Sequence, residues 1–158
     1  YYKRKGILRL GIYAEGVYST QGLFKNYTAS ILKAPAFQPT PESKTLFLES
    51  FRAYQYAAVG QKLIINFKEN LDLRVEGYIF QPFRTIIKQV NKTSSFGRQF
   101  DKRYLIGSAA LVYHSPLGPV SLSVNYYHNV PEVAQADKTP LTVLFHFGYI
   151  IFNRKALD

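Results

Sequence analysis

Leu141-Thr142-Val143-Leu144-Phe145-His146-Phe147-Gly148-Tyr149-Ile150-Ile151-Phe152 is the stretch that decides the fold. Counted from Leu141, every second side chain as far as Ile151 is apolar or aromatic, so a strand here would carry an unbroken apolar stripe on one face. A stripe of this length needs a large apolar surface to cover it. A lipid bilayer is a natural partner for strands of about ten residues that have one apolar and one mixed face.

The strand that precedes this stretch alternates in the same way. It follows the turn Ser115-Pro116-Leu117-Gly118-Pro119, whose proline and glycine residues are typical of a tight connection. One face is predicted to carry Val120, Leu122, Val124 and Tyr126, and the other Ser121, Ser123, Asn125 and Tyr127. The two stretches are therefore predicted to be consecutive long strands.

Period-two alternation extends over four further segments, residues 5–20, 54–67, 71–88 and 102–114. Their apolar faces are predicted to carry Leu8, Leu10, Ile12, Ala14 and Tyr18 in the first; Ala57, Val59, Leu63 and Ile65 in the second; Leu71, Leu73, Val75, Ile79 and Phe83 in the third; and Leu105, Ala109, Leu111 and Tyr113 in the fourth. We therefore predict an all-β chain with six long strands and no helix.

Short and long connections alternate along the chain. Residues 68–70 and 115–119 are short, whereas residues 21–53, 89–100 and 130–140 are long and polar. This alternation is typical of bacterial outer-membrane barrels, although a soluble up-and-down barrel could share it. Six strands are too few to close around a filled interior, which needs about eight. We therefore expect residues 1–158 to be the C-terminal part of one larger antiparallel transmembrane β-barrel, with a long lumen or extracellular loop at about 21–53.

The composition agrees with a barrel and excludes a transmembrane helix. Aromatic residues make up 16% of the 158 residues and the mean hydropathy is −0.12. No stretch approaches the length of about eighteen apolar residues that a helical span requires. The absence of Cys excludes a disulfide framework and a thiolate metal site. Because the chain has neither Met nor a signal peptide, we interpret it as a mature or excised piece.

The net charge of +10 suits two partners, nucleic acid and anionic lipid head groups. The cations are dispersed along the sequence, which favours a third interpretation, cations in the lumen and on the rims of a barrel. A mixed-charge lumen face is predicted from Arg9, Glu15, Asp72, Arg74 and Glu76. We expect these charges to neutralise one another and not to form an ion-selectivity filter, since the sequence indicates no ring of side chains with the same charge.

The turn and the last strand resemble a known family. Ser115-Pro116-Leu117-Gly118-Pro119 is similar to the S-P-x-G-P turn before the penultimate strand of the BamA/TamA/FhaC barrel superfamily of bacterial surface antigens, and Phe145-His146-Phe147-Gly148-Tyr149 is similar to its C-terminal assembly strand. The resemblance implies that the six strands are the last six of sixteen, a number within the range of bacterial barrels. It gives roles in the turn and in barrel assembly to Pro116, Gly118, Pro119, Phe145, Phe147, Tyr149 and Ile151.

The same resemblance assigns a role to the long loop. The family inserts its longest loop into the lumen with a V-R-G-F/Y tip, and Phe51-Arg52-Ala53-Tyr54 matches its arginine and aromatic residue but not its glycine. The arginine of the family pairs with an acidic lumen residue, often in F-x-D, and Tyr78-Ile79-Phe80 stands in that region without an Asp. The resemblance therefore implies a loop anchor formed by Arg52 and Tyr54, with Glu76, Asp72 or Glu15 as the acidic partner. Residues 26–41 also resemble the barrel that follows patatin-like phospholipase domains.

The sequence carries no catalytic constellation. A patatin-type site needs a Ser in G-x-S-x-G and an Asp partner, and no G-x-S-x-G occurs here. His114, His128 and His146 are isolated and lack metal-ligand spacing. We predict no catalytic, cofactor-binding or metal residues in this segment, while a patatin-like serine lipid hydrolase upstream in the parent chain stays open.

These observations favour a segment of the outer membrane of a Gram-negative bacterium. We expect it to anchor its protein and to assist insertion or translocation of polypeptide, as the membrane domain of a patatin-like phospholipase or, alternatively, of an assembly or secretion factor without a hydrolase. A soluble basic β-domain that binds nucleic acid is disfavoured, because the apolar faces are aliphatic and do not interleave cations with aromatic residues. The expected partners are outer-membrane lipids, the N-terminal strands of the barrel, a polypeptide client and, as an open alternative, a second copy in a homodimer, but no nucleic acid.

Overall fold

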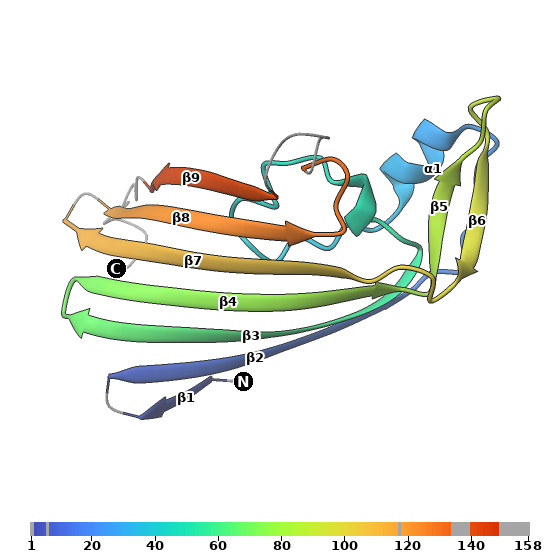
Figure 1. Cartoon of the computed structure of the whole chain (residues 1–158). Coiled ribbons are helices and arrows are strands. Elements are labelled where there is room, and N and C mark those ends of the chain that lie inside the picture. Colours follow the sequence, from blue (N-terminus) through green and yellow to red (C-terminus); the bar gives the residue numbers. More distant parts are fainter. Residues whose placement is uncertain (1, 6, 117, 134–139, 149–158) are drawn as a thin grey trace, which may run out of the picture.

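The computed structural model describes residues 2–5, 7–116, 118–133 and 140–148. Their main feature is a seven-stranded antiparallel sheet in the order β1-β2-β3-β4-β7-β8-β9 (Figure 1). The strands are β1 (Tyr2–Lys5), β2 (Leu8–Tyr18), β3 (Gln55–Lys68), β4 (Leu71–Pro82), β7 (Tyr104–Ser115), β8 (Gly118–His128) and β9 (Leu141–Phe147). The prediction of antiparallel β-structure is confirmed. β1 and β9 form the two edges, and the strand pairings of the described residues do not join them.

Two predicted strands are wrong in extent. The strand predicted to begin at Lys5 begins at Leu8 instead, because Lys5 belongs to β1, an unpredicted strand that folds back and pairs with β2, with Lys5 opposite Leu8. The segment predicted over 71–88 holds two strands, because β4 ends at Pro82, which has no N–H to continue the ladder. β5 (Arg84–Lys88) then pairs with β6 (Ser94–Gln99) in a separate hairpin, where a loop over 89–100 was expected.

The prediction of no helix is also wrong. α1 (Tyr27–Lys33) begins after Asn26, whose side chain accepts a hydrogen bond from the N–H of Thr28 at 2.8 Å, and it ends at Ala34, just before Pro35. A single 3-10 turn, η1 (Glu49–Phe51), lies further along the same connection. Neither helical element is long and apolar enough to cross a membrane.

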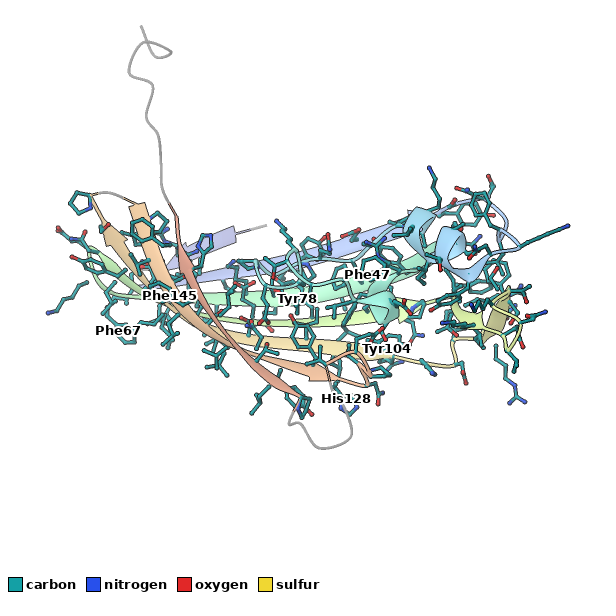
Figure 2. All side chains as sticks on the ribbon, turned by 90° about the horizontal axis from the view of Figure 1, so that it is seen from above. Phe47, Phe67, Tyr78, Tyr104, His128 and Phe145 are labelled. Carbon is teal, nitrogen blue, oxygen red and sulfur yellow. The ribbon has the colours of Figure 1, made fainter. Side chains whose placement is uncertain are left out.

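The connections sort to opposite ends of the sheet, as predicted. Short turns join β1 to β2, β3 to β4 and β7 to β8 at one end, here called the turn end. The long connections lie at the opposite end, here called the loop end, where α1, β5 and β6 stand together beyond the strands (Figure 1). In Figure 2, Phe67 and Phe145 lie toward the turn end, and Phe47 and Tyr104 lie toward the loop end.

One face of the sheet, here called the outer face, is aliphatic across six strands. Pairing aligns Leu10, Leu63, Val75, Ala109, Val124 and Val143 in one row from β2 to β9. It aligns Leu8, Ile65, Leu73, Leu111, Leu122 and Phe145 in the next. Val143 and Phe145 each keep 67% of their surface exposed. The apolar faces predicted for β2, β3, β4, β7, β8 and β9 therefore coincide on one exposed surface.

The opposite, inner face is polar toward the turn end and aromatic toward the loop end. Its polar row contains Lys62, Glu76, Ser108, Asn125 and Thr142, and its aromatic rows contain Tyr13, Tyr56, Tyr78, Phe80, Tyr104 and Tyr127. Gly60 permits one of these rings, because a Cβ at this position would stand only 2.2 Å from the ring of Tyr78. The aromatic part of this face is covered by the connection between β2 and β3.

Candidate functional site: the segment on the inner face

Residues 35–53, here called the inner segment, pack on the aromatic part of the inner face, whereas residues 21–34, which include α1, lie at the loop end (Figure 1). Phe37 stacks on Phe80 with ring centroids 5.4 Å apart and an interplanar angle of 14°. Phe51 lies 5.5 Å from Phe80 and 5.6 Å from Tyr104. Phe37 and Phe51 are each 1% exposed, so these contacts form a dry core between the segment and the sheet.

Glu42 joins the inner segment to the last two strands. Its carboxylate accepts hydrogen bonds from Tyr127 Oη at 2.9 Å and from Thr142 Oγ1 at 2.7 Å. The side chain is 5% exposed, and hydrogen bonds to a buried carboxylate are charge-assisted and strong. Glu42 therefore fixes the segment to β8 and β9.

A closed turn presents this carboxylate to the strands. The N–H of Thr40 donates to Ser43 Oγ at 3.1 Å, and the N–H of Ser43 donates to Thr40 Oγ1 at 3.2 Å. Ser43 Oγ also donates to the carbonyl of Thr40 at 2.8 Å. Because both side chains are buried and bonded to each other's backbone, the turn is rigid and holds Glu42 in place.

Two further contacts fix the C-terminal half of the segment at the loop end. Glu132, in the connection between β8 and β9, accepts from the N–H of Ser50 at 2.7 Å and from Ser50 Oγ at 2.8 Å. Tyr27 Oη in α1 donates to Glu49 at 2.6 Å. Burial and this hydrogen bond raise the pKa of Tyr27, so the phenol stays protonated and keeps donating.

Arg52 holds α1 rather than a carboxylate. Its Nη1 donates to the carbonyls of Ile31 and Leu32 at 3.4 Å and of Ala34 at 3.2 Å, at the C-terminal end of α1 where carbonyls lack helical partners. Its guanidinium carbon lies 4.6 Å from the centroid of Phe47. Burial lowers the pKa of this guanidinium. The carboxylate pairing expected for Arg52 is absent from the ion pairs of the described residues.

The three acidic residues expected as partners of Arg52 are paired within the sheet. Glu76 accepts from Lys62 Nζ at 2.8 Å and from Tyr78 Oη at 2.7 Å. Asp72 lies 2.8 Å from His114 Nε2 and 3.4 Å from Arg74 Nη2. Glu15 accepts from Tyr56 Oη at 2.5 Å. Side chains of the same or an adjacent part of the sheet therefore satisfy all three carboxylates.

Tyr54 contacts α1, close to Arg52. Its Oη donates to the carbonyl of Ser30 at 3.0 Å, and its ring meets that of Phe96 edge-on at 6.4 Å. Arg52 and Tyr54 thus both bind the backbone of α1, which places them together at the loop end. They are separate from Asp72 and Glu76, which contact partners inside the sheet.

The predicted turn and assembly strand lie at the turn end. Gly118 has φ of 137°, a conformation that favours glycine, and its carbonyl accepts from Ser115 Oγ at 2.6 Å. The N–H of Gly148 donates to the carbonyl of Pro119 at 2.8 Å, which ties the end of β9 to this turn. Phe145 and Phe147 are exposed on the outer face, whereas Tyr149 and Ile151 fall outside the described residues.

Sequence reasoning missed Glu42, Ser50 and Glu132, the polar residues that fix the inner segment. Within the described residues no group of His, Cys, Asp or Glu side chains could hold a metal ion. The comparisons with protein-family models, curated proteins and solved structures gave no match. The arrangement itself is a folded segment held by aromatic stacking and buried hydrogen bonds against one face of a curved sheet, with an aliphatic surface on the other.

Proposed function

We propose that this chain is the C-terminal part of a membrane-spanning β-barrel in the outer membrane of a Gram-negative bacterium, and that it anchors its protein there. The observation that carries the proposal is the outer face, whose aliphatic rows continue in register from β2 to β9. A contiguous apolar surface of this kind must be covered by a membrane or by another protein, because soluble monomers keep such patches to a few hundred Å².

The extent of the outer face supports a lipid bilayer as the medium that covers it. Along β4 the apolar positions run from Leu71 to Ile79, a distance of about 27 Å at 3.4 Å per residue. A strand tilt of about 45° reduces this to about 19 Å along the membrane normal, close to the apolar band of about 25 Å in bacterial barrels. The apolar stretch of β4 therefore spans about three quarters of the height of that band.

The open edges support a larger barrel. β1 and β9 leave backbone donors and acceptors along both sides of the sheet, and within hydrocarbon each unsatisfied group costs several kcal/mol. Further strands of the parent protein would pair with these edges and close the barrel, with sixteen strands in total by the resemblance stated above. The inner segment then lies inside the lumen as a plug fixed by Glu42 and by its aromatic residues.

For the parent protein we propose the membrane domain of a patatin-like phospholipase, in which the barrel assists insertion or translocation of polypeptide. The alternative is an assembly or secretion factor without a hydrolase domain. The intact mass and peptide map of the native protein separate the two. An upstream G-x-S-x-G with an Asp partner supports the first, and upstream sequence without them supports the second.

Folding into bilayers tests the membrane proposal itself. The full-length protein, diluted from urea into phosphatidylcholine vesicles, should become protected from added protease over its strands. The same dilution without lipid should leave the strands digestible or the protein aggregated. A protein that folds to a protease-resistant, soluble state without lipid would overturn the proposal.

A further inference from the structure

Positively charged residues from two segments that are distant in the sequence lie together at the loop end. Residues 21–34 and 84–100 contain Lys25, Lys33, Arg84, Lys88, Lys92 and Arg98, and they contain no Asp or Glu. All six cations are exposed. Six of the 20 lysine and arginine residues therefore cluster at one end of the fold, where Glu49 and Glu132 accept hydrogen bonds from Tyr27 and Ser50, although the sequence had indicated a dispersed arrangement. Such clustering produces a positive potential at the surface.

Backbone and side-chain contacts hold these two segments together as one unit, here called the loop-end unit. The N–H of Tyr27 donates to the carbonyl of Lys92 at 3.0 Å, and the N–H of Ser94 donates to the carbonyl of Lys25 at 3.3 Å. Ser30 Oγ donates to Ser94 Oγ at 3.0 Å. Figure 1 shows α1, β5 and β6 of this unit side by side at one end of the sheet.

A pocket of about 510 Å³ lies where the outer face meets the loop-end unit. Tyr18 and Phe83 form aromatic walls at the end of the outer face, and Phe96 forms a third wall from β6. Ser19 and Arg84 contribute polar groups. The pocket thus joins an apolar surface on one side to a cationic surface on the other.

Arg84 is held in this pocket by aromatic rings and not by a carboxylate. Its guanidinium carbon lies 5.5 Å from the centroid of Phe83 and 5.8 Å from that of Phe96. Among the described residues its side chain forms neither an ion pair nor a hydrogen bond, so the guanidinium donors remain available. A planar guanidinium oriented by aromatic faces suits a phosphate, which it can bind through two parallel hydrogen bonds.

We propose that this pocket binds the phosphate of an anionic membrane lipid, with Arg84 as the contact residue and the other five cations of the loop-end unit as the attracting field. The inference rests on the proposed membrane location and adds a specific lipid site to it. Continuity with the outer face selects a lipid over a soluble anion, because the acyl chains would continue over the aliphatic rows below the pocket. Each exposed cation near an anionic surface adds attraction, and aromatic side chains are enriched at the membrane interface.

Native mass spectrometry of the full-length protein in zwitterionic micelles, titrated with phosphatidylglycerol or phosphatidylcholine, tests the site. The wild-type protein should retain phosphatidylglycerol in preference to phosphatidylcholine. Arg84→Gln should bind phosphatidylglycerol about tenfold more weakly, as expected for loss of a charged hydrogen-bonding group. Arg84→Lys should keep an intermediate affinity. Lys44→Gln, which removes an exposed charge from the inner segment, should bind as the wild type does.

Three results would overturn the proposal. Equal retention of phosphatidylglycerol by the wild type and by Arg84→Gln removes the site. Displacement of the lipid by soluble glycerol phosphate at a similar concentration assigns the pocket to a free phosphate. If the protein binds a short oligonucleotide or an acidic peptide through Arg84 but binds no lipid, the pocket belongs to a different partner. Protease protection in pure phosphatidylcholine vesicles, measured for each variant, separates these outcomes from failure of the membrane proposal.

Discussion

Replacement of Val124 by Arg places a charge in the centre of the proposed membrane band. Val124 lies on the outer face between Ala109 of β7 and Val143 of β9. Through β7 its row continues to Val75, which stands midway between Leu71 and Ile79 along β4. Val124 is 45% exposed, so a longer side chain fits without a clash and the effect of the change is electrostatic.

The expected loss of folding free energy follows from the position of Val124 in the membrane band. Arg on the lipid face at the bilayer midplane costs about 2–4 kcal/mol in a transmembrane barrel, which is a change of about thirtyfold to a thousandfold in the folding equilibrium. The same substitution on the surface of a soluble sheet would change the stability by only about 0.5 kcal/mol. The two accounts of the outer face therefore differ by more than the error of a folding measurement.

Ser123→Arg is the matched control, because Ser123 lies at the same depth on the inner face, opposite Ala110 and Leu144. Folding equilibria of the full-length variants, measured by urea titration in phosphatidylcholine vesicles, give the comparison. Val124→Arg should lose about 2–4 kcal/mol and Ser123→Arg much less. Equal losses, or a larger loss for Ser123→Arg, would refute the assignment of the faces.

Three further predictions concern the inner segment, and limited proteolysis of the folded protein measures each of them. Glu42→Gln should weaken the bonds to Tyr127 and Thr142 by about 1–2 kcal/mol and speed cleavage within residues 35–53. Glu69→Gln in the exposed β3–β4 turn should leave the digestion pattern unchanged. Arg52→Ala should release the end of α1 and expose residues 31–34 to protease, with Arg52→Lys giving a partial effect; an unchanged pattern for Arg52→Ala would remove its anchoring role. Phe37→Ala should cost about 3–5 kcal/mol of packing energy and give the fastest cleavage of the three variants. If it is cleaved more slowly than Glu42→Gln, the aromatic core is not the main support of the inner segment.

The outer face could be predicted from the sequence because the backbone alone sets its period. Successive side chains of a strand point to opposite faces, so a single strand such as 120–126 already reveals which residues share a face. Antiparallel pairing then brings the faces of neighbouring strands together. The same logic failed at Pro82, where the alternation continues into β5 although the chain leaves the sheet.

The support of the inner segment could not be predicted because its contacts are distant in sequence. Glu42 lies 85 residues from Tyr127 and 100 residues from Thr142, and nothing in the local pattern around Glu42 marks it as buried. The helix that Arg52 holds carries weak local signals, Asn26 before it and Pro35 after it, and its seven residues are too few for a helical period to stand out. The cationic loop end was likewise concealed, since its charges come from two segments about sixty residues apart.

In the proposed barrel the outer face contacts lipid, and the inner face contacts water or the inner segment. Residues 1–158 contain no Cys, so single cysteines can be introduced at successive positions from 119 to 127, with any cysteine elsewhere in the parent chain replaced, and spin-labelled in the full-length protein in vesicles. The collision rate with oxygen, which concentrates in lipid, should be high at Val120, Leu122, Val124 and Tyr126 and low at the residues between them. Uniform rates along the strand, or high rates at Ser121, Ser123 and Asn125, would contradict the claim.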